Sequence, residues 1–292
     1  MLNLQIITNL VALLTKLRLL IMKYFLSLMV FFMFSCNMKF KTSKSKEYKE
    51  KGDWIQLFNG KDLNNWICKF AGNPVNENYK NTFRIEDEIL KVSYDEYENF
   101  NNKFGHLFYK SEFSNYKLRV EYRFTGKQTK GSPAWAYMNN GIMIHSQSPQ
   151  SMNLNQLFPV SIEVQLVGTD KDTKRPTAGV CTPGVNIEIN GKLTTQHCVQ
   201  SIAKTYKNNE WVTVEVVVLG NSSIQHFIDG KKVLEYHKPI IGGTGKPDNY
   251  SIPDGTPLTK GYIAIQAEGH PAEFRKIELI ELEVTETNIK TP

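Results

Sequence analysis

Apolar and polar residues alternate with a period of two along most of the chain after residue 52. Residues 116–124 give the clearest case, because every second side chain is apolar, namely Tyr116, Leu118, Val120, Tyr122 and Phe124. The residues between them are charged. This alternation predicts a β-strand with one buried face and one face in water.

Similar alternation predicts further strands, and hardly any segment shows the helical period. Asp229-Gly230 supplies the positive φ angles of a two-residue hairpin turn, and residues 82–93 read as another hairpin. The expected strands and hairpins therefore cover residues 54–58, 82–93, 106–110, 116–124, 140–145, 161–167, 211–219, 226–236, 261–268 and 274–284. About a dozen short strands without an internal repeat or a domain break predict one all-β, two-sheet antiparallel sandwich. The Gly/Pro-rich stretch 239–257 is expected to be a long loop between two of its strands.

The N-terminus has the features of a bacterial export signal. Lys23 precedes an apolar run over residues 24–35, and Cys36 follows Ser35 directly. A basic residue, a short apolar run and a small residue before the cut are typical of such signals, and a Cys at this place resembles a lipobox. The run is shorter than the ~20 residues of a membrane-spanning helix. We therefore predict that residues 1–36 are a signal peptide and that Cys36 is lipidated.

Two alternatives concern the segment before this signal. Met22 followed by Lys23 would begin a more ordinary signal peptide, so translation could start at Met22 instead of Met1. An uncleaved apolar N-terminal helix is the other alternative. Residues 37–51, rich in Lys, Ser and Glu, predict a flexible tether to a domain over residues 52–286. The expected location is the bacterial cell envelope, with the membrane reached through the lipid.

Composition and charge exclude two broad classes. The 41% hydrophobic and 22% charged content is ordinary for a globular protein and excludes wholesale disorder. Residues 1–36 hold three basic residues and no acidic one, so without them the net charge falls from +6 to +3. A charge this small and scattered argues against a nucleic-acid partner.

Three cysteines remain after Cys36. Export permits a disulfide between Cys181 and Cys198, which would add about 3 kcal/mol by closing a loop of ~16 residues. Cys68 would then be a buried thiol. No C-x-x-C spacing occurs, so a cysteine-based metal site is not indicated.

Several separate motifs together resemble one family. Residues 54–66 (WIQLFNGKDLNNW) and 261–279 (GYIAIQAEGHPAEFRKIEL) lie at the two ends, and the segments 140–145, 161–165, 211–215 and 229–231 lie between them in order. Over residues 53–283 the chain resembles the 3-keto-disaccharide hydrolase domain family. The resemblance implies a concanavalin A-like jelly roll, the architecture of lectins and glucanases. It also implies an exported protein that acts on a glycan or a 3-keto-disaccharide.

Alternate positions on neighbouring strands would form the floor of a sugar cleft. Glu163 and Gln165 are two residues apart and share a face, and Gln266 and Glu268 do the same. His145 ends the strand beside them. Carboxylates, amides and a histidine suit sugar hydroxyls and proton transfer. For each of them the competing interpretation is an ordinary solvent-facing or structural residue.

Five further residues are candidates for the cleft. Arg275 could bridge to a cleft carboxylate or simply hold the last strand, and His270 and His106 are two further histidine candidates. Trp135 and Tyr137 lie in a loop, where they could stack on a sugar ring or pack as rim residues.

A ketone at C3 of a sugar makes its C2 proton acidic, so a base can remove it and the C1 group can be eliminated, after which water adds. We assign His145 or Glu163 as the base and Glu268 as the acid. Arg275 or a divalent cation would polarise the ketone. The sequence requires no cofactor, although His and carboxylates could hold such a cation.

Other functions remain open. A retaining glycosidase needs two nearby carboxylates, and on the laminarinase-type jelly roll these come from one Glu-x-Asp-x-Glu strand. Here the strand contains only Glu163-Val-Gln165. A carbohydrate-binding lipoprotein without catalysis is the main alternative, and a purely structural envelope protein is a weaker one.

Overall fold

The computed structural model describes residues 9, 12–24 and 41–291. Residues 12–24 are helical. Among the described residues, no helix is both long and apolar enough to cross a membrane. Cys36 and the segment 25–35 lie outside the described residues, so lipidation and the signal peptide stay predictions. The chain divides into two compact units, one of residues 1–47 with 285–292 and the other Tyr48–Val284.

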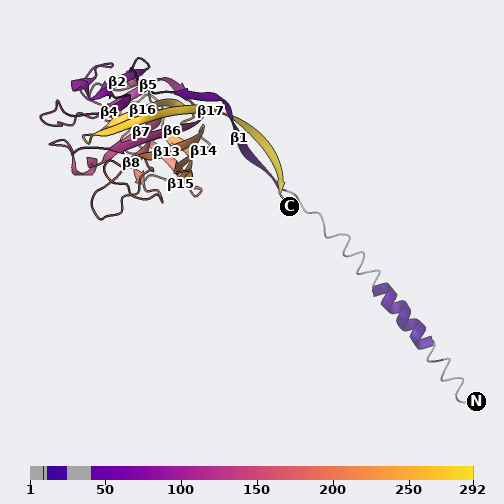
Figure 1. Ribbon diagram of the computed structural model, residues 1–292. Coiled ribbons are helices and arrows are strands. Elements are labelled where there is room, and N and C mark those ends of the chain that lie inside the picture. Colours follow the sequence, from indigo (N-terminus) through magenta and orange to yellow (C-terminus); the bar gives the residue numbers. More distant parts are fainter. Residues whose placement is uncertain (1–8, 10–11, 25–40, 292) are drawn as a thin grey trace, which may run out of the picture. The chain divides into compact units, whose positions relative to one another are not determined.

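The strands of the second unit form two antiparallel sheets (Figure 1). The larger sheet has the order β11-β10-β15-β14-β13-β6-β17-β4-β3, and β1 also pairs with β17. Its strands are β1 (Lys41–Gln56), β3 (Phe83–Glu86), β4 (Ile89–Val92), β6 (Asn115–Phe124), β10 (Val185–Ile189), β11 (Lys192–Thr194), β13 (Val212–Leu219), β14 (Ser223–Ile228), β15 (Lys231–Ile241) and β17 (Ala272–Thr291).

The smaller sheet has the order β12-β9-β8-β7-β16-β5-β2. Its strands are β2 (Trp66–Phe70), β5 (Gly105–Phe113), β7 (Asn139–Ser146), β8 (Ile162–Val167), β9 (Gly179–Cys181), β12 (Cys198–Val199) and β16 (Gly261–Ala267). Three short 3₁₀ helices lie in the loops: η1 (Tyr79–Asn81), η2 (Ala134–Ala136) and η3 (Pro149–Ser151). The prediction of an all-β, two-sheet antiparallel jelly-roll sandwich is confirmed.

The core lies between the two sheets and follows the alternation in the sequence. Along β6 the even-numbered residues from Tyr116 to Phe124 are buried and the others are partly exposed. The inward residues of β7 and β8, which include Ile142 and Val164, join the same apolar cluster. Because directly opposite residues of paired strands share a face, the other side chains of β7 and β8 point to the outer face of the smaller sheet.

Local turn chemistry explains the predicted hairpins. Asp229 and Gly230 have φ angles of 50° and 74°, so they form the tight turn between β14 and β15. Between β3 and β4, Asp87 and Glu88 also have positive φ angles, 52° and 61°. Both hairpins of the prediction are confirmed.

The observed strands differ from three expected boundaries. β1 begins at Lys41 and pairs with β17, so it overlaps the second part of the predicted tether, residues 37–51. The predicted domain end at residue 286 falls inside β17, which continues to Thr291. The expected loop 239–257 begins later, since β15 continues to Ile241 and pairs with β10.

Candidate functional site

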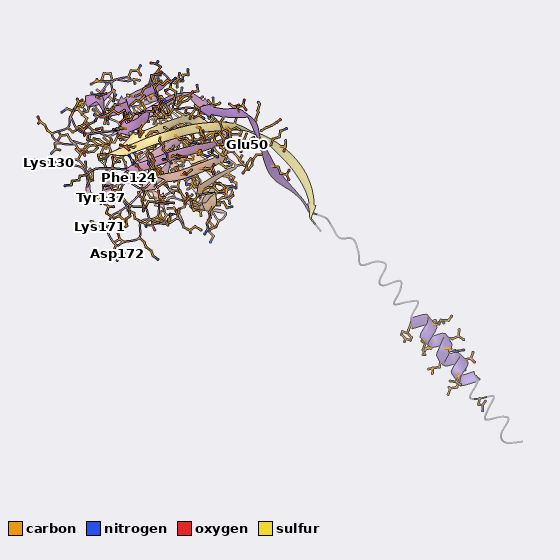
Figure 2. The ribbon with its side chains drawn as sticks, in the orientation of Figure 1. Glu50, Phe124, Lys130, Tyr137, Lys171 and Asp172 are labelled. Carbon is orange, nitrogen blue, oxygen red and sulfur yellow. A yellow bond between two sulfur atoms is a disulfide. The ribbon has the colours of Figure 1, made fainter. Side chains whose placement is uncertain are left out.

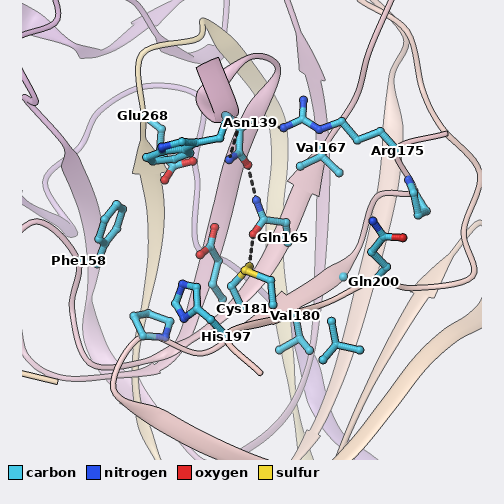
Figure 3. Close-up of a pocket in the computed structure, with 17 residues that line it drawn as sticks. Asn139, Phe158, Gln165, Val167, Arg175, Val180, Cys181, His197, Gln200 and Glu268 are labelled. Carbon is cyan, nitrogen blue, oxygen red and sulfur yellow. Dashed lines mark hydrogen bonds between the residues drawn. A yellow bond between two sulfur atoms is a disulfide. The ribbon is translucent and has the colours of Figure 1, made fainter. Parts of the chain in front are cut away.

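A pocket of about 430 Å³ lies on the outer face of the smaller sheet (Figure 3). Strands β7, β8, β9 and β12 contribute to it, together with the loops that follow them and residue 268 just after β16. Its lining consists of Trp135, Asn139, Phe158, Glu163, Gln165, Val167, Arg175, Pro176, Gly179, Val180, Cys181, Pro183, His197, Cys198, Val199, Gln200 and Glu268. Polar side chains from β7, β8 and residue 268 therefore meet an apolar wall of valines, prolines and cysteines.

Glu163 lies in this pocket as the strand pattern predicts. Its neighbours Ile162 and Val164 point into the core, so Glu163 points to the opposite face. Its side chain is 6% exposed, and its Oε1 has no hydrogen-bond partner among the described residues. Burial raises the pKa of Glu163 from 4.5 to about 8, because the charged form loses its hydration.

Gly141 supplies the space for this carboxyl group. It pairs with Gln165 across β7 and β8, and a Cβ atom placed on Gly141 would lie 2.4 Å from Oε1 of Glu163. Any side chain at position 141 would therefore collide with the Glu163 carboxyl. The glycine allows the acid to lie flat over β7.

Glu268 is the second acid of the pocket. It is 2% exposed, and burial raises its pKa well above the usual value. The negative charge of Glu163 raises it further, whereas the positive charge of Arg175 lowers it. Next to it, Gly269 has a φ of 96° and donates its N–H to the Tyr94 hydroxyl at 2.7 Å, which holds the backbone in place. The two carboxyl groups are thus electrostatically linked, and ionising one favours a proton on the other.

Arg175 is a pocket residue that the sequence interpretation missed. Its Nη1 donates to the carbonyl oxygens of Tyr137, Met138 (3.2 Å) and Gly168 (2.9 Å), and its Nη2 donates to that of Trp135 (2.9 Å). Burial lowers the pKa of Arg175, and the nearby Glu268 opposes this. No motif or spacing marks this arginine, which follows a basic and polar loop. Its charge faces the acids, and its guanidinium group holds the loop that carries Trp135.

Two amides line the floor beside the acids. Gln165 donates from Nε2 to Oδ1 of Asn139, and Oε1 of Gln165 lies against Sγ of Cys181 (Figure 3). Asn139 also donates to the Trp135 carbonyl at 3.4 Å. Gln165 lines the pocket, and its role in substrate binding stays a prediction; Asn139 was missed.

The predicted disulfide between Cys181 and Cys198 is present. The two residues are direct neighbours across β9 and β12, and both belong to the pocket lining. Cys68 is the buried free thiol, as expected, and burial raises its pKa to about 12. The bridge fixes the two-residue strand β12 against the pocket wall.

The predicted aromatic residues take different positions. Trp135 lines the pocket and is 51% exposed, while its ring stacks on Phe104 with centroids 5.8 Å apart and planes 4° from parallel. Tyr137 contacts the buried His270 edge-on at 5.4 Å, and Nζ of Lys171 lies 5.8 Å from its ring centroid. Tyr137 and Lys171 lie at the same end of the domain (Figure 2). Burial lowers the pKa of His270 to about 4. Tyr137 and His270 are not among the lining residues of this pocket, so their predicted contact with substrate stays a prediction.

His145 was predicted as a cleft residue, and this is wrong. It has a φ of 48°, and the pairing of β16 with β7 shifts at this end of the strand, so simple alternation fails here. Its Nε2 lies 3.0 Å from the carbonyl oxygen of Gly220, and burial lowers its pKa to about 4. It is a neutral structural histidine away from the pocket lining.

Arg275 was also predicted in the site, and this is wrong. Arg275 lies on β17, a strand of the larger sheet, and because the preceding Phe274 points into the core, the Arg275 side chain points to the outer face of that sheet. There Nε donates to Glu121 at 2.6 Å, and the guanidinium lies 4.4 Å from the ring centroid of Trp211. The alternative interpretation, that Arg275 holds the last strand, describes it correctly.

Two predicted residues lie beside the pocket. Gln266 and His106 are paired across β16 and β5, and both are fully buried. Neither belongs to the pocket lining, although the register of the sheet puts them on the same face as Glu163. For the expected cation, the described part of the chain contains no group of three or more His, Cys, Asp or Glu that could hold a metal. His197, which sequence reasoning also missed, lies on the pocket wall.

The protein is an all-β jelly-roll sandwich with a pocket on the outer face of one sheet. Two buried acids, Glu163 and Glu268, lie in this pocket and influence each other's charge. Residues 53–280 match the 3-keto-alpha-glucoside-1,2-lyase-like domain, and the chain belongs to this family. The resemblance inferred from the motifs is therefore confirmed. The family is one of carbohydrate-related hydrolases and lyases.

Solved structures of similar fold have low sequence identity to this chain. Two are presumed glycosyl hydrolases from Parabacteroides distasonis ATCC 8503, at 20% identity with a TM-score of 0.47 and 17% with 0.48. They cover 78% and 79% of this chain, which in turn covers 98% and 94% of theirs. A Bacillus subtilis protein of unknown function with a galectin-like fold shows 10% identity and a TM-score of 0.44, covering 81% of this chain and 99% of its own. Among curated proteins, none matches this sequence.

Proposed function

We propose that the pocket binds a 3-keto-glycoside, such as a 3-keto-disaccharide, and cleaves it by elimination followed by hydration. The observation that carries the proposal is the pair of buried, linked acids, Glu163 and Glu268, on the pocket floor. Family membership supports the substrate class, since the matched domain is described as 3-keto-alpha-glucoside-1,2-lyase-like.

In this proposal Glu163 is the base and Glu268 is the acid. With a pKa of about 8, Glu163 is ionised in a minor fraction of the protein at pH 7 and in most of it above pH 8, and the ionised form is the base. Because the charge of Glu163 raises the pKa of Glu268, ionised Glu163 keeps the proton on Glu268. The pair can therefore enter the reaction with one carboxylate and one carboxylic acid.

Glu163 and Glu268 carry out every proton transfer of the two half-reactions. Glu163 takes the proton from C2, the C1–O bond breaks, and Glu268 protonates the departing oxygen. Water then adds to the enone: its oxygen bonds to C1, one of its protons returns to Glu268, and Glu163 gives its proton back to C2. Both acids regain their starting states.

Arg175 takes the electrostatic role first considered for Arg275. Its charge faces Glu268 within the pocket lining, where a positive group stabilises the negative charge of the enolate. Trp135 offers an exposed ring for stacking on the sugar. The apolar wall around Val180 and Val199 would contact the leaving group.

Envelope location forms part of the proposal. The Cys181–Cys198 disulfide supports export, because such bonds persist in oxidising compartments. Lipid attachment at Cys36 would hold the protein at the membrane. In cells supplied with a labelled fatty acid, the wild-type protein should incorporate the label and a Cys36→Ala variant should not, and equal labelling of both would reject lipidation of this residue.

The direct test uses the purified protein with a 3-keto-glycoside and with its unoxidised parent, each with and without EDTA. We expect release of 3-ketoglucose from the ketone alone, and the EDTA samples decide whether a divalent cation takes part. The variant Glu163→Gln should lower the rate by about 10²-fold or more. Arg275→Gln is the matched control, because that residue lies on the other sheet, and it should keep the wild-type rate.

Each other result would change the assignment. An unchanged rate in Glu163→Gln would remove Glu163 as the base. Cleavage of the unoxidised parent would indicate an ordinary glycosidase. Sugar binding without any release would indicate the carbohydrate-binding lipoprotein.

A further inference from the structure

A continuous row of residues crosses the smaller sheet beside the pocket. Gln165 pairs with Gly141, Gln266 pairs with His106, and His106 pairs with Lys69. Between β16 and β7, Ile265 pairs with Ile142, and the same antiparallel register continued by one residue brings Gln266 opposite Gly141, which joins the two halves. All these residues share one face, because directly opposite positions in paired strands do so.

The middle of this row contains buried polar groups without protein partners. Gln266 and His106 are fully buried. In the described part of the chain, neither the two ring nitrogens of His106 nor the amide nitrogen and oxygen of Gln266 have a hydrogen-bond partner. A buried donor or acceptor without a hydrogen bond lowers the stability of the folded state by about 1–3 kcal/mol. Buried polar groups that lack a protein partner therefore normally bind water.

Glu163 reaches into the same row. Its carboxyl occupies the space above Gly141, and its Oε1 also has no partner among the described residues. Adjacent positions across a sheet are ~5 Å apart, so one or two water molecules can link Glu163, Gln266 and His106. Burial and the charge of Lys69 lower the pKa of His106 to about 3, so its neutral ring offers one donor and one acceptor.

The row ends at Lys69 on one side, and on the other side it reaches Gln165 and Glu163, which line the pocket. The ammonium group of Lys69 donates to the carbonyl oxygens of Phe70 (2.8 Å), Asn73 (3.1 Å) and Leu154 (2.9 Å). Phe158, a pocket residue, contacts the ring of His106 edge-on at 6.2 Å. Water bound by His106 and Gln266 would therefore lie next to Glu163, with Phe158 packed against the ring of His106.

We propose that Gln266 and His106 bind the water that hydrates the enone, so that the row supplies the second half-reaction. The inference rests on the proposed function. Elimination needs no water, whereas hydration consumes one molecule for each substrate. Gln266 and His106 act as positioning residues for this water, and Glu163 and Glu268 exchange the protons.

The test separates the two half-reactions in the Gln266→Met variant. Release of the leaving group reports elimination, and loss of the enone absorbance together with 3-ketoglucose formation reports hydration. We expect elimination within a few-fold of wild type and hydration slowed about tenfold or more, so that the enone accumulates. His106→Asn tests the same idea should Gln266→Met fail to fold. Met143→Leu, in the apolar cluster on the same face, is the control and should alter neither step.

Equal loss of both steps, or no change in either, would overturn the proposal. A second measurement does not depend on activity: a high-resolution crystal structure of the wild-type protein should show ordered water between Gln266, His106 and Glu163. A dry row would overturn the proposal even in an active enzyme. Ordered water in a protein that releases nothing from 3-keto-glycosides would refute the proposed function and with it the role of this water in hydration.

Discussion

Replacing Glu163 by Gln should stabilise the folded protein at neutral pH although it removes a proposed catalytic group. The carboxyl has a pKa of about 8 in the folded state and 4.5 as its ordinary value. A raised pKa means that the folded state binds the proton more tightly than the unfolded state. Its contribution to stability is therefore fully present below pH 4.5 and is lost as the pH rises toward 8.

The magnitude follows from the same two values. At pH 7 the unfolded carboxyl is ionised while the folded one is mostly protonated, which costs the native state about 3 kcal/mol relative to pH 4. Glutamine has nearly the same shape and does not ionise, so Glu163→Gln avoids this cost. The free energy of unfolding of the variant should exceed that of wild type by about 3 kcal/mol at pH 7 and by close to nothing at pH 4.

Urea unfolding at the two pH values measures both differences, and thermal unfolding should show a rise in Tm of ~10 °C at pH 7. Glu121→Gln serves as the control, because this surface acid pairs with Arg275 and Lys276 on the other sheet. Its effect should not exceed about 1 kcal/mol. Equal effects of Glu163→Gln at pH 4 and pH 7 would refute the argument that burial raises this pKa.

Three further predictions concern the rest of the pocket. Arg175→Met removes the positive charge that lowers the pKa of Glu268. The alkaline limb of the kcat/KM profile, which reports loss of the proton from the catalytic acid, should therefore move to higher pH. An unmoved limb would show that Arg175 does not influence the pKa of the catalytic acid. Replacing Cys181 and Cys198 together by Ser should lower the free energy of unfolding by about 3 kcal/mol in urea titrations, whereas a loss near zero would contradict the loop-closure estimate. Trp135→Ala should raise KM about tenfold with little change in kcat, because stacking on a sugar contributes about 1 kcal/mol or more; a fall in kcat alone would argue against stacking.

The sequence predicts the sandwich well where one face of a strand is buried and the other is wet. In β6 and β8 the alternation identifies both the core residues and the face that carries Glu163 and Gln165. The disulfide also follows from the sequence, since Cys181 and Cys198 are close in the chain and the predicted export would permit a bond. The strands β9 to β12 were missed, because none exceeds five residues and their polar flanks read as loop.

The site was harder to predict because its other members depend on irregular backbone. Alternation fails at His145, where the register between β16 and β7 shifts, and Arg275 lies on β17, which belongs to the sheet without the pocket. Arg175 enters the pocket from a loop, and its partners are main-chain carbonyls that no sequence pattern reveals. Asn139 lies one residue before the predicted start of its strand.

The residue at position 141 determines whether a family member has room for an acid placed like Glu163. The Glu163 carboxyl occupies the volume that a side chain at this position would need, so glycine and acid form a matched pair. A homologue that keeps the acid but carries a larger residue in place of the glycine must hold its carboxyl elsewhere. Family members with glycine and glutamate at these two positions can therefore hold the acid as this protein does, and members with a larger residue in place of the glycine cannot.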